Sequence, residues 1–328
     1  MATFDLLSLQ PHKVSRDLTG YITYIYGEPK TGKTTLATQA GNALLFAFER
    51  GYNALPGVFP VDVTSWGDTR ALVRELKKKE VKEKFQTVIF DTVDIAGTLC
   101  EKYICAQNNV DRIGEVPYGQ GWTMMKKEFE EVLRTITQLG YALFLISHEK
   151  DKVFKRKDGT EYNQTIPSCP TTFNEIAKNI ADIYGFAEKY GDESGQSKVR
   201  LVLRSVDNSI DCGSRFKYIE PVIDMSYKAL VEAINAAIDK EAELTNGQFV
   251  TDERNFASVA RTLNYDQLIV DFNDLASQLM TKDAAVYGPK ITYIVNKFLG
   301  LNKKVSDTTP AQAEIIDLII GEMKETLI

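Results

Sequence analysis

Short apolar runs alternate with charged stretches over the first three quarters of the chain. The apolar runs have the length of β-strands and lie at residues 21–26, 43–48, 87–90, 141–147 and 199–203. Most of the stretches between them repeat apolar residues at helical spacing, at residues 33–42, 69–80, 95–107 and 122–139. Continuous apolar strands separated by helices predict an α/β fold, in which helices cover both faces of a mainly parallel sheet.

The last quarter of the chain has a different pattern. An amphipathic helix at residues 226–243 ends the α/β region, and a short polar step at 245–247 follows it. Residues 251–328 then indicate several helices and no strand, with Pro310 in the first turn of the last helix. We therefore predict two domains, an α/β core at residues 1–243 and a small all-α domain at 244–328.

Composition and charge exclude several classes of protein. The 328 residues are 44% hydrophobic and 26% charged, which is close to the average of globular proteins. No apolar run is long enough to span a membrane, the N-terminus lacks the features of a secretory signal, and the four cysteines form no C-x-x-C pair. These features predict a cytoplasmic protein with free thiols and no membrane partner.

The net charge of −6 argues against a general nucleic-acid binder, but it is unevenly distributed. Residues 241–328 contain 8 Lys and Arg against 13 Asp and Glu, whereas residues 1–240 contain 31 against 32. The predicted core is therefore almost neutral, and its charge does not exclude DNA.

The strongest motif is the segment GEPKTGKT at residues 27–34, which fits the phosphate-loop pattern G-x-x-x-x-G-K-[ST]. It follows a predicted strand and opens a predicted helix, so its backbone amides and the helix N-terminus would face the phosphates. Lys33 would reach the β- and γ-phosphates, and the Thr34 hydroxyl would bind Mg²⁺. We predict that ATP and Mg²⁺ bind here, with nucleotide contacts from Gly27, Lys30, Thr31, Gly32, Lys33, Thr34 and Thr35.

Two acidic residues at predicted strand ends add to this site. Asp91 closes the apolar run 87–90 and could hold the metal, although Asp94 offers a competing carboxylate. Glu49 ends the run 43–48 and could orient and deprotonate the attacking water, or it could be a surface residue paired with Arg50. We predict Asp91 as the metal residue and Glu49 as the catalytic base.

His148 directly follows the strand predicted at 141–147. Ligands of open α/β sheets bind at the carboxyl ends of the strands, so His148 should lie near the γ-phosphate. There it could sense loss of the phosphate and pass the change to the segment that follows. The alternative is a histidine that only satisfies a buried hydrogen bond.

Taken together, these segments resemble a known family. Residues 27–37, Glu49-Arg50-Gly51, the strand ending at Asp91 and the sequence LISHEK at 145–150 are similar to phage-associated nucleotide-binding proteins of AAA type. Those proteins have a RecA-like P-loop NTPase core, and some act as single-strand annealing recombinases. The resemblance extends through Ser214-Arg215-Phe216-Lys217 and, more weakly, into the tail.

The resemblance implies an ATPase that forms rings or filaments and handles single-stranded DNA during phage recombination, in the host cytoplasm, with a single-strand-binding protein as an expected partner. The residues after His148 give independent support. Lys and Arg neutralise phosphates and aromatic rings stack on bases, which is how single strands are bound without sequence preference. The predicted DNA-binding residues are Lys150, Lys152, Phe154, Lys155, Arg156 and Lys157, and the alternative is a solvated hairpin tip.

Two further segments could take part in function. Arg215, like Lys217, matches the family position for a cation that completes a neighbouring subunit's site, and either could be an ordinary surface charge. The segment 108–121 could be a second DNA loop. Two other functions fit the sequence: a nucleotide-dependent switch or loader that docks a partner through its helical tail, and a small-molecule kinase.

Overall fold

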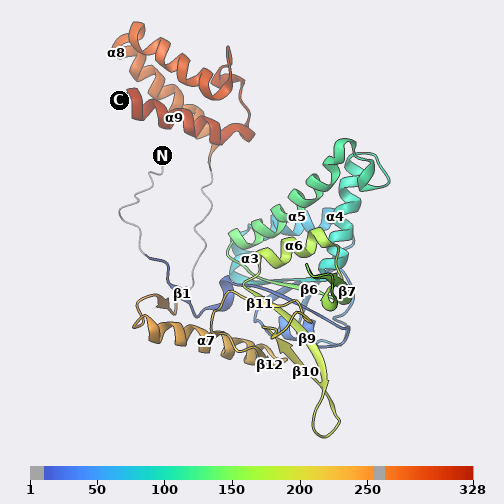
Figure 1. Ribbon diagram of the computed structural model, residues 1–328. Helices are drawn as coiled ribbons and strands as arrows, with labels where there is room; N and C mark the ends of the chain where they lie inside the picture. The colour runs from blue at the N-terminus through green and yellow to red at the C-terminus, as the bar shows by residue number, and fades with distance from the viewer. Residues whose placement is uncertain (1–10, 254–262, 328) are drawn as a thin grey trace. The chain divides into compact units, whose positions relative to one another are not determined.

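The computed structural model describes residues 11–253 and 263–327, which form two compact units (Figure 1). The first unit contains the described residues up to 253, and the second contains the remainder. The stretch after residue 243 belongs to the first unit because β13 (Val250–Thr251) pairs in parallel with β1 (Val14–Ser15). The contacts therefore place the division between units later in the chain than the predicted boundary at 243.

The first unit is built on a nine-stranded, mostly parallel sheet. Its strands follow the order β12-β10-β9-β2-β6-β5-β3-β4, and β11 pairs with β9. The run from β9 to β4 is parallel, whereas β10, β11 and β12 form antiparallel pairs at one side. The strands are β2 (Ile22–Gly27), β3 (Ala43–Ala47), β4 (Phe59–Asp62), β5 (Thr87–Asp91), β6 (Ala142–Ser147), β9 (Ile183–Gly191), β10 (Ser197–Val202), β11 (Gly213–Ser214) and β12 (Val222–Asp224).

Helices cover both faces of this sheet (Figure 1). Successive side chains of a strand point to opposite faces, so Tyr24 and Phe90 enter one apolar cluster, whereas Ile25 and Ile89 enter another. The first cluster is closed mainly by α2 (Trp66–Glu75), α4 (Val93–Gln107), α5 (Gln120–Gln138) and α6 (Thr171–Ile180). The second is closed by α1 (Lys33–Thr38) and α7 (Tyr227–Leu244). The shorter elements are α3 (Lys79–Lys84) and the 3-10 turns η2 (Leu18–Gly20), η3 (Ile113–Glu115) and η4 (Pro117–Gly119).

A separate two-stranded hairpin connects β6 to α6. It consists of β7 (Glu149–Lys155) and β8 (Glu161–Pro167), which pair in antiparallel register. The Tyr26 hydroxyl of β2 donates to the Thr165 carbonyl at 2.9 Å, so the base of the hairpin is bonded to the central sheet.

The second unit is helical. It consists of α8 (Tyr265–Leu299), interrupted by extended backbone at Asp283, then η5 (Val305–Asp307), η6 (Pro310–Gln312) and α9 (Ala313–Leu327). Pro310 lies in the 3-10 turn that leads into α9, close to its predicted position. The helices bury an apolar core of their own, which includes Leu279, Ile316 and Met323.

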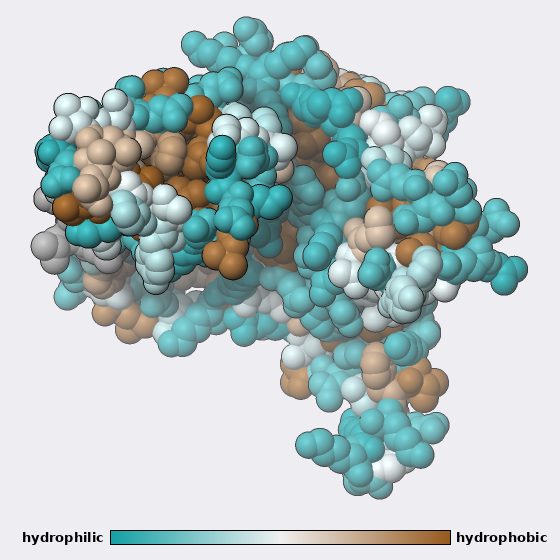
Figure 2. All heavy atoms as spheres, turned by 90° about the horizontal axis from the view of Figure 1, so that it is seen from above, coloured by the Kyte–Doolittle hydropathy of each residue, from teal (hydrophilic) through white to brown (hydrophobic). Residues whose placement is uncertain are grey.

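The predicted fold class is confirmed: a mainly parallel sheet lies between layers of helices, and a helical region follows it in the chain. Hydrophilic residues cover most of the face seen in Figure 2. Within residues 11–253 and 263–327, every helix is too short or too polar to cross a membrane.

Candidate nucleotide site and adjoining hairpin

The phosphate loop connects β2 to α1 as predicted. Gly27 ends β2 with a φ of 153°, and a Cβ placed there would lie 2.5 Å from the carbonyl oxygen of Ala187 on β9. Gly32 precedes α1 in the left-handed region at a φ of 86°. Both positions therefore favour glycine for steric reasons, the first because a neighbouring backbone is close and the second because of its φ.

Lys33 is buried under this loop and has only 5% of its surface exposed. Its amine donates to the carbonyls of Gly27 at 2.8 Å and Glu28 at 2.7 Å. Burial lowers the pKa of Lys33 to about 8, against the opposing effect of nearby carboxylates. A buried ammonium group has lost most of its hydration, and the loop carbonyls replace only part of it. A phosphate would supply the missing negative charge, so this position favours an anionic ligand.

Thr34 and Asp91 meet across the loop. The Thr34 hydroxyl donates to Asp91 Oδ2 at 2.7 Å, and Asp91 is 3% exposed at the end of β5. Burial raises the pKa of Asp91 to about 6, the Thr34 hydrogen bond lowers it, and the Glu49 carboxylate raises it further. The hydroxyl and carboxylate oxygens predicted to serve Mg²⁺ therefore lie side by side.

Glu49 and His148 form a pair on the same side of the loop. His148 Nε2 lies 3.3 Å from Glu49 Oε1, and this contact raises the pKa of His148. The alternative pairing of Glu49 with Arg50 does not occur, because Arg50 contacts Asp62 at 3.2 Å instead. The predicted base and the predicted sensor thus contact each other directly.

These residues line one cavity of about 250 Å³. It is lined by Pro29, Lys30, Thr31, Gly32, Lys33, Thr34, Thr35, Glu49, Gly51, Leu55, Asp91 and His148. Of the residues predicted for the nucleotide, the metal and the catalytic base, only Gly27 is not part of this lining.

The charge around the cavity suits a divalent cation. The carboxylates of Asp91, Glu149, Glu49 and Asp94 all act on the single amine of Lys33. In residues 11–253 and 263–327, no three His, Cys, Asp or Glu side chains converge on one metal position. Mg²⁺ is usually held by one or two carboxylates, with waters and substrate phosphates as further ligands, so Thr34 and Asp91 fit that role.

The DNA-binding residues predicted after His148 lie on β7 and the turn beyond it. Phe154 stacks on Tyr162 of β8 with ring centroids 5.7 Å apart. Lys152 lies over the Phe154 ring at 5.1 Å, and Arg156 lies over the Tyr162 ring at 4.6 Å. We call Lys152, Phe154, Arg156 and Tyr162 the basic-aromatic face.

The other predicted members are placed differently. Lys155 points to the opposite side of the strand, in register with Glu161, and Lys157 lies in the exposed turn. The Lys150 amine donates to the Ser168 carbonyl at 2.9 Å at the base of the hairpin. The predicted DNA-binding residues therefore lie on both faces of the hairpin, in its turn and at its base.

Arg215 lies away from the cavity within this chain. It binds Asp182 Oδ1 at 3.0 Å and the Asn179 carbonyl at 2.8 Å. Asp182 precedes β9, and the start of β9 pairs with the start of β2, whereas the phosphate loop follows the end of β2. Arg215 is therefore at the opposite edge of the sheet and cannot act on a nucleotide bound to its own subunit.

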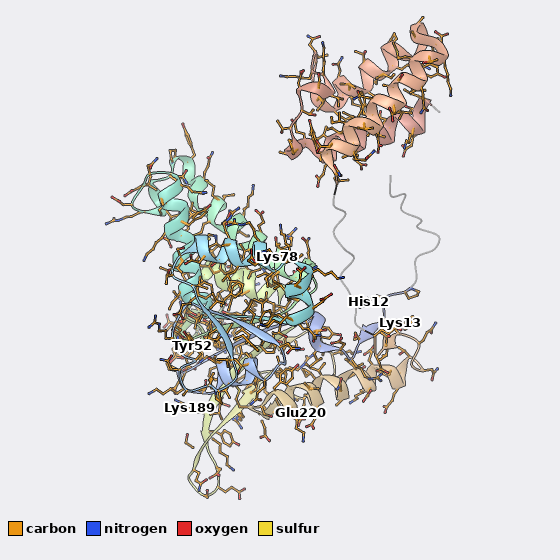
Figure 3. The ribbon with its side chains drawn as sticks, turned by 180° about the vertical axis from the view of Figure 1, so that it is seen from behind. His12, Lys13, Tyr52, Lys78, Lys189 and Glu220 are labelled. Carbon is orange, nitrogen blue, oxygen red and sulfur yellow. The ribbon has the colours of Figure 1, made fainter. Side chains whose placement is uncertain are left out.

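A different cation lies beside the phosphate loop. Lys189 of β9, labelled in Figure 3, forms an ion pair with Glu28 of the loop. Sequence analysis missed it because the apolar run at residues 183–187 was not identified as a strand, and Lys189 lies in the charged half of β9 that follows this run. Strand pairing of Gly27 with Ala187 brings this part of β9 to the loop.

The second predicted DNA loop forms the tip between α4 and α5. It folds into η3 and η4, and Tyr118 there is 97% exposed. Its side chain has no aromatic or cationic partner in the described part of the chain. The segment does not join the cavity.

Residues 19–216, more than half of the chain, match the family model described as an AAA domain. The chain therefore belongs to this family of nucleotide-binding domains. It is 24% identical over 333 residues to an uncharacterized protein, YorG, derived from the SPbeta prophage of Bacillus subtilis (strain 168). That match covers 98% of both chains, so it includes the helical unit as well as the AAA domain.

Proposed function

We propose that the protein is a Mg²⁺-dependent ATPase that binds single-stranded DNA and promotes its annealing or strand pairing in phage recombination. The observation on which the proposal depends is the position of the hairpin. It begins at His148, which contacts Glu49 in the nucleotide cavity, and it presents cations and aromatic rings together. The prophage origin of the similar YorG protein supports a phage setting.

In this proposal each cavity residue has a separate task. Lys33 neutralises charge on the β- and γ-phosphates, and Thr34 and Asp91 hold Mg²⁺, which supplies electrostatic stabilisation of the phosphates when bound. Glu49 accepts a proton from the attacking water, because its carboxylate lines the cavity. His148 keeps Glu49 in position through their contact at 3.3 Å.

The basic-aromatic face suits single strands of any sequence. Lys152 and Arg156 supply positive charge for phosphates, and the rings of Phe154 and Tyr162 offer stacking surfaces for bases. We further propose that subunits assemble as a ring or filament, in which Arg215 of one subunit can reach its neighbour's nucleotide. A single-strand-binding protein is the expected partner.

The DNA part of the proposal is tested with labelled oligothymidine and fluorescence anisotropy at several salt concentrations. Wild-type binding should weaken steeply with salt, because each phosphate contact on a single strand contributes roughly 0.7 to the slope. The double variant Lys152→Ala/Arg156→Ala should bind more weakly and reduce the slope by about 1.4. Lys155→Ala/Lys157→Ala is the matched control of similar charge change and should have a smaller effect.

Equal binding of DNA by the wild type and both double variants would refute the assignment of the basic-aromatic face.

The nucleotide part is tested separately by Lys33→Ala, which removes an amine that can donate two charge-assisted hydrogen bonds to phosphate. The affinity for ATP should fall by at least about 100-fold, since each such bond contributes roughly 1.5–3 kcal/mol. Normal ATP turnover in this variant would refute the phosphate site.

A second function, a nucleotide-dependent switch that docks a partner protein, is favoured by one observation. The helical unit exposes large apolar side chains, among them Tyr293 at 70% and Leu301 at 82% of their surface. Exposed apolar side chains of this size are common at protein interfaces. Absence of DNA binding together with retained ATP binding would favour this function over the first.

A further inference from the structure

Both ends of the β7–β8 hairpin are linked to the nucleotide site by side-chain contacts. His148 precedes β7 and Ser168 follows β8, and we call these two residues the hairpin root. The Ser168 amide donates to the His148 carbonyl at 2.8 Å, which closes the root. His148 was expected near the phosphates, whereas Ser168 was not, because nothing in the local sequence marks it.

Ser168 contacts a carboxylate that lies outside the lining of the nucleotide cavity. Its hydroxyl donates to Asp94 Oδ1, in the first turn of α4. Asp94 follows Asp91 by three residues, and Asp91 is the residue bonded to Thr34. The other oxygen, Asp94 Oδ2, is buried and has no hydrogen-bond partner among the described residues.

The two sides of this contact are held firmly. A Cβ on Gly97 of α4 would lie 2.4 Å from the ring of Phe173 on α6. The Phe173 ring therefore packs directly against the backbone of α4. Cys169, next to Ser168, is buried with its sulfur 3.4 Å from the Tyr24 hydroxyl. Because the flanking segments are tightly packed, a shift of the segment from Asp91 to Asp94 would be transmitted to Ser168 rather than absorbed.

The root therefore has two separate links to the cavity. One joins β7 to Glu49 through His148, and the other joins β8 to the metal-residue segment through Ser168 and Asp94. A hairpin held at one strand alone could pivot about that contact. Links to both strands fix its orientation, and with it the direction of the basic-aromatic face.

We propose that Asp94 and Ser168 are positioning residues that couple the occupancy of the nucleotide site to the orientation of the hairpin. The proposal rests on the proposed function for its DNA readout, but the coupling itself concerns only the nucleotide and the hairpin. Neither residue lines the nucleotide cavity, and neither belongs to the basic-aromatic face. Their loss should therefore weaken the link between the two sites while leaving each site intact.

The test compares single-stranded DNA affinity with and without Mg²⁺ and a slowly hydrolysed ATP analogue. For the wild type we expect the analogue to change the affinity by about tenfold, within the range usual for coupled sites. Ser168→Ala should reduce this change to about threefold or less, with ATP affinity and nucleotide-free DNA affinity close to wild type. Asp94→Asn should keep most of the coupling, because the amide oxygen still accepts from Ser168.

Ser194→Ala is the matched control, since Ser194 makes the same type of bond to Asp192 in the β9–β10 hairpin at 2.5 Å. It should behave as wild type. A wild-type affinity change in Ser168→Ala, or equal losses in both serine variants, would overturn the proposal. A purely structural role for Ser168 would lower the affinity for DNA equally in both nucleotide states.

Hydrogen exchange of residues 149–167 provides a readout without DNA. Addition of Mg²⁺ and the analogue should change exchange in the hairpin of the wild type, and this change should be lost in Ser168→Ala. If the wild type fails to bind DNA, the proposed function is wrong, and the exchange experiment still decides the coupling. An unchanged exchange pattern in the wild type would overturn it.

Discussion

At the residue scale, the nucleotide cavity concentrates negative charge around one buried amine. Lys33 is surrounded by four carboxylates and lies under carbonyls of its own loop. Burial in this cavity disfavours the ionised form of Asp91 and raises its pKa, and the Glu49 carboxylate adds to the effect, whereas Lys33 opposes it. Binding of a divalent cation would offset the cost of burying this carboxylate in its ionised form. The cavity residues therefore lower the stability of the ligand-free protein and favour ligand binding.

Asp91→Asn tests this cost through pH. Burial raises the pKa of Asp91 to about 6, so its contribution to stability is fully present below its unfolded-state pKa and is lost as pH rises through 6. At pH 8 the neutral variant should therefore be more stable than wild type, by up to about 3 kcal/mol for a shift of about two pKa units.

Denaturant unfolding without nucleotide at pH 8 and at pH 4 measures the effect. The difference between variant and wild type should be large at pH 8 and small at pH 4. Mg²⁺-dependent ATP hydrolysis should be lost in the same variant. A variant that is less stable than wild type at pH 8 would contradict the account of Asp91.

Glu49→Gln separates catalysis from binding. The amide retains the size of the side chain but cannot accept a proton from water, so hydrolysis should fall by about 10²- to 10⁴-fold. Affinity for ATP should stay near the wild-type value, because Glu49 lies at the side of the cavity rather than in the phosphate loop. Parallel loss of ATP affinity and turnover would instead indicate a structural Glu49.

The sequence allowed these residues to be predicted because each follows a strand in a parallel sheet. Glu49, Asp91 and His148 occupy ends of adjacent strands, and strand order alone brings such residues together. The contact of Ser168 with Asp94 was not predictable, because it joins residues 74 positions apart and nothing in the sequence places the end of the hairpin beside α4. Arg215 was assigned to a neighbouring subunit's nucleotide site by resemblance, and strand register puts it at the edge of the sheet opposite the phosphate loop of its own chain.

At the scale of elements, helix α4 depends on one glycine. Gly97 lies in the middle of the helix, where glycine is normally unfavourable by roughly 1 kcal/mol relative to alanine. Here the ring of Phe173 occupies the space that a Cβ would need, and Phe173 is fully buried. Close packing of α4 on α6 therefore outweighs helix propensity.

Gly97→Ala should accordingly lower the free energy of unfolding, by about 1–3 kcal/mol for an overpacked core position. Gly321→Ala is the matched control, because Gly321 lies inside α9 and a Cβ there would meet nothing within 4 Å. It should raise stability by roughly 0.5–1 kcal/mol. Thermal and denaturant unfolding of both variants measure the two signs, and an equal effect would disprove the packing argument.

Element boundaries show where local pattern was insufficient. The helix predicted at 33–42 ends at Thr38, since Gly41 and Asn42 have positive φ values of 54° and 46°. The helix predicted at 69–80 is divided into α2 and α3 near Lys77 and Lys78, in a run without apolar residues. Helix α6 went unrecognised because its apolar residues are few, and the apolar run of β9 at residues 183–187 was not identified as a strand.

At the scale of the whole molecule, the described residues 11–253 and 263–327 form three apolar cores. Two of them lie on the faces of the central sheet, and the third lies within the helical unit. The two units share no member of these cores, and each contains its own packed helices. Independent cores predict units that fold separately.

A chain that ends at residue 258 tests this independence. It retains both sheet-face cores and all residues that line the nucleotide cavity. Its ATP affinity should therefore remain within about twofold of that of the full chain, whereas a tenfold change would correspond to about 1.4 kcal/mol. Calorimetric unfolding of the full chain should show a transition that disappears in the shortened chain, because α8 and α9 unfold as their own unit. A large loss of ATP affinity, or a single cooperative transition in the full chain, would contradict separate folding.

Residues 263–327 contain 6 Lys against 9 Asp and Glu, so their removal should also strengthen DNA binding at low salt if the helical unit repels the strand. Unchanged DNA binding would instead favour a role for its exposed apolar residues in docking a protein partner.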